Sequence, residues 1–391
     1  MQTITLAQRR ARLARRHRLA ARARIDDVAR IAGDLLGLHA TDLASVHLSA
    51  LARMAGADAG AIERAMYVQR SIIRMLGMRR TMFVLPTELA AVVQAACTRA
   101  VAAGERRKAV RMLESAGVTD DAGTWLADIE HKTLAALHER GDALSAELSE
   151  AVPELAQKFV VGEDTRYPAT LTVSSRVLLL LSADGHIVRG RPRGSWTSTQ
   201  YRWTPMSTWL GDDLPTLPDA PARVTLARRW LRQFGPATVA DLIWWTGWTK
   251  TQTRRALAEI APLEVDLEGK TGILLAGDDE PVDEVEPWAA LLPALDPTTM
   301  GWTERGWYLG DHRGALFDRN GNAGPTIWWD GRIVGGWAQR ADGQIATRLL
   351  EDVGTPARAA IAAEVERLTA ILADRRFTPK FRTPLERELT S

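Results

Sequence analysis

The order in which helical and extended patterns follow each other is the feature that most constrains the fold of this chain. Three times, a group of helical segments leads to two short extended runs that are typical of a hairpin. In the first group, the apolar spacing predicts helices at 25–37, 43–54 and 59–67. Two strands follow within 71–85, and Pro86 ends them. Three helices followed by a hairpin predict a winged helix-turn-helix unit at 25–85.

The same order returns at 86–212 and at 213–286. The second unit is expected to hold helices at 88–102, 104–115, 122–139 and 144–150 before a hairpin of 185–190 and 200–203. In the third unit, helices at 223–233, 239–244 and 250–260 precede a hairpin of 263–267 and 272–275. Sequence identity between the units is low, so the repetition is one of architecture and not of residues.

The pattern changes after Pro293. Short aromatic or β-branched runs at 306–309, 315–319, 326–330, 332–337 and 344–350 are separated by turn residues, which favours a small β-barrel at 287–354. A helix at 356–374 and a loosely ordered basic tail at 375–387 complete a C-terminal segment of 355–391. With an N-terminal arm at 1–24, the prediction is an α+β fold of three tandem winged-helix units plus a barrel.

Charge is distributed very unevenly along the chain, although the formal net charge is only +2. Residues 1–24 hold eight arginines and no acid, and residues 223–260 hold seven basic residues and two acids. In contrast, residues 261–296 hold ten acids and a single base, Lys270. This asymmetry indicates one surface suited to a polyanion, although clustered arginine is also common on a solvated helix face. The arm is expected to gain order by lying on the body or on nucleic acid.

Composition excludes several classes of protein. The single cysteine, Cys97, rules out a disulfide framework and a cysteine-rich zinc site. The apolar runs are far shorter than the roughly 20 residues that a membrane span requires, and we expect a cytoplasmic protein. No phosphate-binding glycine loop or metal-binding histidine pair is present, so we expect no cofactor and no metal.

Four motifs resemble those of the AlkZ/YcaQ-like DNA glycosylases over roughly residues 25–372. They are Leu36-Gly37-Leu38-His39-Ala40-Thr41-Asp42, Arg79-Arg80-Thr81-Met82-Phe83-Val84, Leu292-Pro293-Ala294-Leu295-Asp296-Pro297, and Ala323-Gly324-Pro325-Thr326-Ile327 with Asp330-Gly331-Arg332-Ile333-Val334-Gly335-Gly336-Trp337. The resemblance implies a C-shaped clamp around duplex DNA that removes alkylated purines, including bulky and interstrand-crosslinked ones. We therefore expect damaged duplex DNA as the partner of a monomeric, nucleoid-associated protein.

The chain departs from the family at its catalytic signature. The family has Gln-apolar-Gln after the Leu-Gly-Leu turn, with His or Asp replacing one Gln in some branches, and here the matching positions read His39-Ala40-Thr41. On an extended loop, residues i and i+2 point the same way, so His39 and Thr41 would face the substrate together. Asp42 is the nearest carboxylate, and either Thr41 or Asp42 stands where the next helix needs its N-cap. We predict His39, Thr41 and Asp42 as catalytic residues.

The DNA-contact candidates recur at equivalent positions of the successive units. The start of the third unit's recognition-like helix, the first two wings and a hairpin of the barrel supply them. They are Lys250, Thr251, Thr253, Arg254 and Arg255 on the helix, Arg79, Arg80, Arg189, Arg191 and Arg193 on the wings, and Arg313, Arg319, Asn320 and Asn322 on the barrel.

Two functions fit these observations. The first is a monofunctional DNA glycosylase that hydrolyses the glycosidic bond of purines alkylated at N7 or N3. The second is a winged-helix DNA-binding protein without catalysis that acts as a regulator or sequesters lesions. Release of free base from alkylated duplex DNA separates the two.

Overall fold

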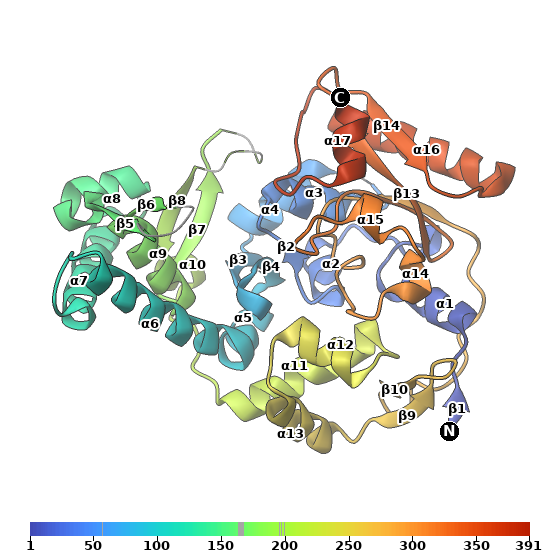
Figure 1. Ribbon diagram of the computed structural model, residues 1–391, viewed down its shortest axis with the longest axis horizontal. Helices are drawn as coiled ribbons and strands as arrows, with labels where there is room; N and C mark the ends of the chain where they lie inside the picture. The colour runs from blue at the N-terminus through green and yellow to red at the C-terminus, as the bar shows by residue number, and fades with distance from the viewer. Residues whose placement is uncertain (57, 163–167, 195, 197, 199) are drawn as a thin grey trace.

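The computed structural model describes residues 1–391 except for 57, 163–167, 195, 197 and 199. Helices and five small sheets alternate in the described part, which is a mixed α+β architecture. Among these described residues, no helix is both long and apolar enough to cross a membrane. Figure 1 shows the second unit as a lobe that stands beside a larger body formed by the rest of the chain.

Three short helices of the first unit begin in the same way. An aspartate precedes each helix, and its carboxylate accepts a backbone N–H from the first turn: Asp27 from Arg30, Asp42 from Ala44 and Asp58 from Gly60. The helices are α2 (Val28–Asp34), α3 (Leu43–Leu51) and α4 (Ala59–Tyr67). The predicted hairpin is confirmed as β3 (Ile72–Leu76) and β4 (Met82–Pro86), and β2 (Leu38–His39) adds to its β4 edge.

The second unit forms the lobe. The hairpin β7–β8 confirms the second predicted strand pair, and β7 contacts β3 of the first unit. The elements are α5 (Ala90–Val93), α6 (Arg99–Ser115), α7 (Ala122–Arg140), α8 (Ser145–Ala151), β5 (Lys158–Val161), β6 (Ala169–Thr172), α9 (Val173–Ala183), β7 (Ile187–Pro192), β8 (Tyr201–Pro205) and α10 (Met206–Leu210).

The third unit and the N-terminal arm are packed together. Helices α11 (Asp219–Phe234), α12 (Val239–Thr246) and α13 (Lys250–Ile260) precede the third predicted hairpin, β9 (Leu263–Asp266) and β10 (Thr271–Leu274). Strand β1 (Gln2–Thr3) of the arm pairs in parallel with β9, and α1 (Leu6–Arg16) follows it. All three hairpins are therefore present, while their assignment as winged-helix units and the domain boundaries stay predictions.

The expected β-barrel is wrong. Strands β11 (Ala289–Leu292), β12 (Thr326–Trp329), β13 (Arg332–Gln339) and β14 (Ile345–Leu349) form an open antiparallel sheet in that order, with β11 and β14 at its two edges. Helix α16 (Gly354–Leu372) packs on β11, and α17 (Pro384–Thr390) packs on β13. The helices bury the apolar faces that barrel closure would otherwise bury.

Two runs expected as strands are helices. The segment 306–309 forms α14 (Gly306–Leu309), and 315–319 is replaced by α15 (Arg313–Leu316). Aromatic side chains favour strands on average, but here packing decides, because Tyr308 stacks on Trp328 with ring centroids 5.2 Å apart. Tertiary contact therefore overrides local propensity in this stretch.

The basic tail is also better ordered than expected, because α17 lies within 375–391. Leu385 and Leu389 of this helix are buried. Gly336 on β13 permits the approach, since a Cβ there would lie 2.7 Å from Leu385 Cδ2. The amphipathic spacing of these leucines was the overlooked signal.

Candidate active site and nucleic-acid interface

The His39–Asp42 loop is fixed by backbone contacts on both sides. It leaves α2 through Leu36 and Gly37, whose φ angles of 50° and 116° lie in the left-handed region. A Cβ at Gly37 would lie 2.6 Å from Leu85 Cδ2, so this turn requires glycine. Ala40 N–H donates to Met82 O at 2.8 Å, and Ala40 O accepts from Arg74 Nη2 at 2.7 Å. Ala40 is thus held by a backbone hydrogen bond to β4 and by a side-chain hydrogen bond from β3.

His39 is buried at the start of this loop. Its side chain is 5% exposed, and its ring centroid lies 4.7 Å from that of Phe83. Burial, with a smaller effect from the positive charge of Arg79, lowers the pKa of His39 to about 3. His39 is therefore neutral near pH 7, and its buried Nδ1 has no hydrogen-bond partner among the described residues.

Asp42 is the N-cap of α3. Its Oδ1 accepts the N–H of Ala44 at 3.0 Å, and the carboxylate also accepts the backbone N–H of Lys380 from the C-terminal segment. Burial nevertheless raises the pKa of Asp42. The N-cap of α3 is therefore Asp42 and not Thr41, which is half-buried beside it.

A buried ion pair behind the loop was not predicted as a site. Arg53 on the segment after α3 and Asp296 in the Leu292–Pro297 motif are both fully buried, and Arg53 Nη2 lies 2.7 Å from Asp296 Oδ1. Asp296 also accepts from Ser49 Oγ and from the N–H of Thr298. The pair joins the first unit to the C-terminal region. The sequence signals Asp296 by its place in the Leu292–Pro297 motif, where apolar residues and prolines flank a single carboxylate.

The start of α13 presents exposed side chains. Lys250, Thr251, Arg254 and Arg255 are all exposed, and the three cations among them make no ion pair within the part of the chain that the structure describes. Thr253 is different, because it is fully buried and its Oγ1 donates to Thr249 O at 3.1 Å. Thr253 lies on the buried face of α13 with Ala256 and Ile260, and this helix packs on α11. The expected DNA contact by Thr253 therefore requires that α13 move away from α11.

The arginines of the wings differ in environment. Arg80 pairs with Glu105 at 2.7 Å, Arg191 lies 3.8 Å from Glu63, and Arg193 is exposed. Arg79 and Arg189 lie instead against aromatic rings. Their charges are therefore open to an anion to very different degrees.

The C-terminal candidates lie on α15 and the turn that follows, and not on a barrel hairpin. Arg313, Arg319 and Asn320 are exposed. Asn322 Nδ2 donates to Asp318 Oδ2 at 2.8 Å, so its side chain stabilises the turn. Of this group, only the three exposed side chains can reach a partner without rearrangement.

Three arginines of the arm form ion pairs with the acidic run 278–286. Arg16 pairs with Asp278 at 2.8 Å, Arg15 with Asp283 at 3.3 Å and Arg22 with Glu286 at 2.6 Å. The acidic run 278–286 is therefore the partner of the arm. Of the two alternatives for the arm, the structure shows the one in which it lies on the body.

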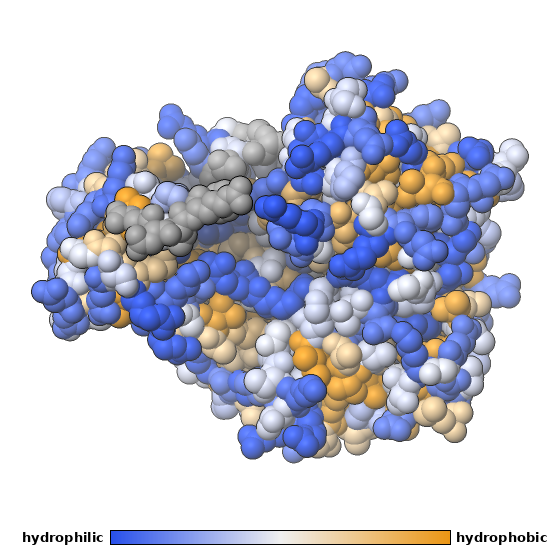
Figure 2. All heavy atoms as spheres, viewed as in Figure 1, coloured by the Kyte–Doolittle hydropathy of each residue, from blue (hydrophilic) through white to orange (hydrophobic). Residues whose placement is uncertain are grey.

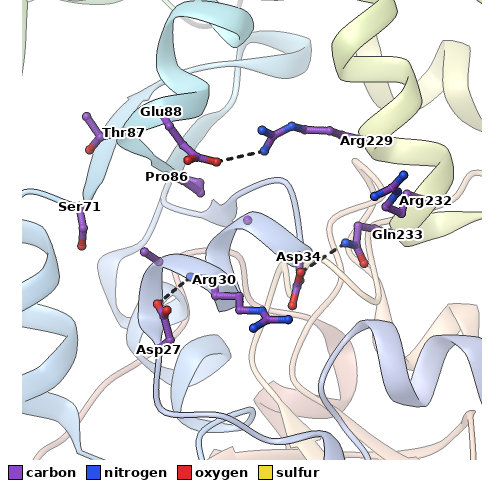
Figure 3. A pocket seen from close by; sticks show the side chains of 12 residues that line it. Asp27, Arg30, Asp34, Ser71, Pro86, Thr87, Glu88, Arg229, Arg232 and Gln233 are labelled. Atoms are coloured by element: carbon purple, nitrogen blue, oxygen red, sulfur yellow. Dashed lines mark hydrogen bonds and ion pairs between the residues drawn. The ribbon is translucent and has the colours of Figure 1, made fainter.

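A cleft of about 710 Å³ opens between α2, the end of β4 and α11. Figure 3 shows Arg30, Arg229 and Arg232 facing it together with acidic side chains, and Arg229 pairs with Glu88 at 3.3 Å. His39, Thr41 and Asp42 do not line this cleft. Its mixed charges give it no clear preference for an anion.

The face in Figure 2 is hollowed between the lobe and the body, and hydrophilic residues border the hollow. Exposed, unpaired basic side chains at the start of a helix, as on α13, are typical of proteins that bind nucleic acid. The sequence model of the AlkZ-like DNA glycosylases matches residues 32–371. The chain belongs to the AlkZ-like DNA glycosylase family.

Among solved structures, the chain is similar to the Streptomyces sahachiroi DNA glycosylase AlkZ. The two share 20% sequence identity with a TM-score of 0.73, over 94% of this chain and 98% of that one. A search of curated proteins by sequence finds no match. The structural likeness supports a common fold, and the family membership supports a DNA glycosylase role.

Proposed function

We propose that this protein hydrolyses the N-glycosidic bond of purines alkylated at N7 or N3 in duplex DNA, including bulky and interstrand-crosslinked adducts. The observation that carries the proposal is the loop His39–Asp42, which stands where the family has its catalytic signature. It combines a neutral imidazole with a carboxylate whose pKa is raised by burial. The protein would act as a monomer, without metal or cofactor.

Hydrolysis of this bond needs little assistance from the protein. An N7-alkylated purine is cationic, so it accepts the electron pair of the C1′–N9 bond and leaves as a neutral base without a general acid. A water molecule then bonds to C1′ of the oxocarbenium-like sugar. Once bonded, that water is a strong acid, so even a weak base accepts its proton.

The three predicted residues divide this work. The carboxylate of Asp42 stabilises the developing positive charge on the sugar and accepts the proton, because a raised pKa makes it the better base. Neutral His39 orients the water by accepting a hydrogen bond, since a pKa of about 3 makes it a poor base. Thr41 holds the same water through its hydroxyl group.

Free base release tests the proposal. We expect purified protein to release N7-methylguanine from a duplex that contains one such residue, and to leave an abasic strand that breaks only after alkali. Chromatography detects the base, and a denaturing gel detects the strand. If tight DNA binding occurs without release from any N7- or N3-alkylated duplex, the protein is the DNA-binding alternative.

A further inference from the structure

In the described part of the chain, arginines with a buried Nε fall into two groups by their partners; as whole residues Arg53 and Arg74 are buried, whereas Arg189 is half-buried. Arg53 represents the first, because its guanidinium donates to Asp296, Thr298, Ser49 and the carbonyl of His17. Arg74 and Arg189 represent the second. Each has a buried Nε without a partner, and neither makes an ion pair among the described residues. A buried guanidinium normally requires an anion or a full set of acceptors.

Arg74 and Arg189 share one aromatic ring. They come from the contacting strands β3 and β7, and their Cζ atoms lie 5.5 Å and 4.9 Å from the ring centroid of Tyr201. Asp42 attracts Arg74 electrostatically but makes no ion pair with it. Among the described residues, the only hydrogen bond that either guanidinium of this pair makes is from Arg74 Nη2 to Ala40 O in the candidate loop.

A second pair has the same construction. The Cζ atoms of Arg79 and Arg305 lie 3.8 Å and 4.9 Å from the ring centroid of Trp244 on α12. Arg79 also has a buried Nε without a partner, whereas Arg305 donates to Trp302 O and contacts Met300 Sδ. Arg79 is close enough to His39 to lower its pKa. The two pairs thus border the candidate loop, one near Ala40 and one near His39.

Each arginine pair is electrostatically unfavourable without a bound anion. Burial is the main cause that lowers the pKa of Arg74 and of Arg79 to about 10, and the charge of the second arginine in each pair adds to it. An aromatic face stabilises a cation only weakly compared with a bound anion. An anion between the two guanidiniums would remove the repulsion and satisfy the free donors. The planar fork of arginine matches the oxygens of a phosphate.

We propose that the two arginine pairs are phosphate sites, each binding one backbone phosphate of the strand that carries the damaged base, on either side of the candidate loop. This inference rests on the proposed function, because it requires the loop His39–Asp42 to face DNA. The proposal gives a phosphate-binding role to Arg74 and Arg305, which the sequence did not single out. It also names a backbone phosphate as the ligand of Arg79 and Arg189. Together the sites would place C1′ of the target nucleotide against the loop.

A methylphosphonate scan tests the proposal. The probe is a duplex with a tetrahydrofuran abasic site, in which one phosphate at a time is replaced by a neutral methylphosphonate, and fluorescence anisotropy gives Kd. We expect wild-type affinity to fall about tenfold at two positions that flank the abasic site on the same strand. The same change elsewhere is expected to have a much smaller effect.

Variants then assign each position to a site. Arg189→Ala is expected to abolish the sensitivity at one flanking position, and Arg79→Ala the sensitivity at the other. Arg358→Ala, an exposed residue of α16 paired with Asp352, is the control that retains both. Thermal unfolding verifies that each variant is folded, and the wild-type scan needs no variant at all.

The outcomes separate this inference from the proposed function. A flat scan, or a two-position profile that the variants leave unchanged, overturns the phosphate sites even if base release occurs. Competition by inorganic phosphate together with a flat scan assigns the sites to free phosphate and overturns the proposal too. A two-position profile without base release supports the phosphate sites and contradicts only the hydrolysis. Failure to bind either this duplex or an undamaged one overturns both.

Discussion

At the scale of single residues, the Arg53–Asp296 pair joins the first unit to the C-terminal region by a fully buried ion pair. Both side chains are fully buried, so water cannot compensate a charge that loses its partner. Family motifs in the sequence draw attention to Asp296 but do not reveal its partner, because the two residues are brought together only by the fold.

Asp296→Asn is expected to lower the free energy of unfolding by about 3–5 kcal/mol, because Arg53 would keep its buried charge without a counterion. Urea unfolding followed by circular dichroism measures this. The control is Asp58→Asn, which alters an exposed pair with Arg64 and keeps the helix cap, and should cost less than about 1 kcal/mol. Equal losses in the two variants would contradict the role of the buried pair.

Buried histidines predict a pH dependence of stability. Burial is the main cause that lowers the pKa of His17 to about 3 and of His47 to about 4. The unfolded chain, with a histidine pKa of about 6.5, binds protons below that pH that the folded chain does not bind. Stability should therefore be constant above about pH 6.5 and fall below it, by up to about 1.4 kcal/mol per pH unit for each histidine.

Urea unfolding at pH 7.5, 6 and 5 measures this slope. His47→Gln should reduce the slope, whereas replacement of the exposed His131 by glutamine should not. A free energy of unfolding that stays constant from pH 7.5 to 5 would show that these histidines are not neutral and buried.

At the scale of elements, the N-terminal arm is part of the body. Arg12 is 2% exposed, and its guanidinium donates to the carbonyls of Asp278 and Glu280 at 2.8 Å and 2.6 Å. The uneven charge of the sequence indicated a basic arm and an acidic run. It did not show that they pair with each other, because 266 positions in the sequence separate Arg12 from Asp278.

Arg12→Ala is expected to lower the free energy of unfolding by about 1.5–3 kcal/mol through the loss of these two bonds. Arg22→Ala is the matched comparison, since the side chain is 87% exposed and its pair with Glu286 should contribute less than about 1 kcal/mol. Neither variant should change the salt dependence of DNA affinity. A reduced dependence in Arg22→Ala would instead place the arm on DNA.

We expect helix α13, in contrast to the arm, to contact DNA. Arg254 and Arg255 are exposed without ion-pair partners in the described part of the chain. The double variant Arg254→Ala and Arg255→Ala should therefore reduce the slope of log K against log salt by about 2, with unchanged thermal stability. Filter binding at several salt concentrations measures the slope. An unchanged slope would remove α13 from the DNA interface.

At the scale of the whole molecule, local patterns predicted the elements well and their assembly poorly. The helix start after Asp42 and the three hairpins follow from short-range rules that the sequence displays directly, whereas the first helix begins at Val28, after its cap Asp27, and not at residue 25 as expected. The addition of β2 to β4, the open sheet in place of a barrel and the burial of Thr253 depend on contacts between distant segments. The same holds for the site: the loop was predicted, but the arginine pairs that border it were not, since Tyr201 and Trp244 come from other units.

The central claim is that the carboxylate of Asp42 acts in catalysis and not only as a helix cap. Asp42→Asn separates the two roles, because asparagine caps a helix about as well as aspartate but carries no charge. Asp58→Asn makes the same change at the exposed cap of α4. Single-turnover release of N7-methylguanine, with enzyme in excess over duplex, measures the rate of the chemical step in each variant.

We predict that Asp42→Asn lowers this rate at least about 100-fold, with Kd for DNA and thermal stability close to those of the wild type, while Asp58→Asn changes none of the three. Equal single-turnover rates for wild type and Asp42→Asn would contradict the account.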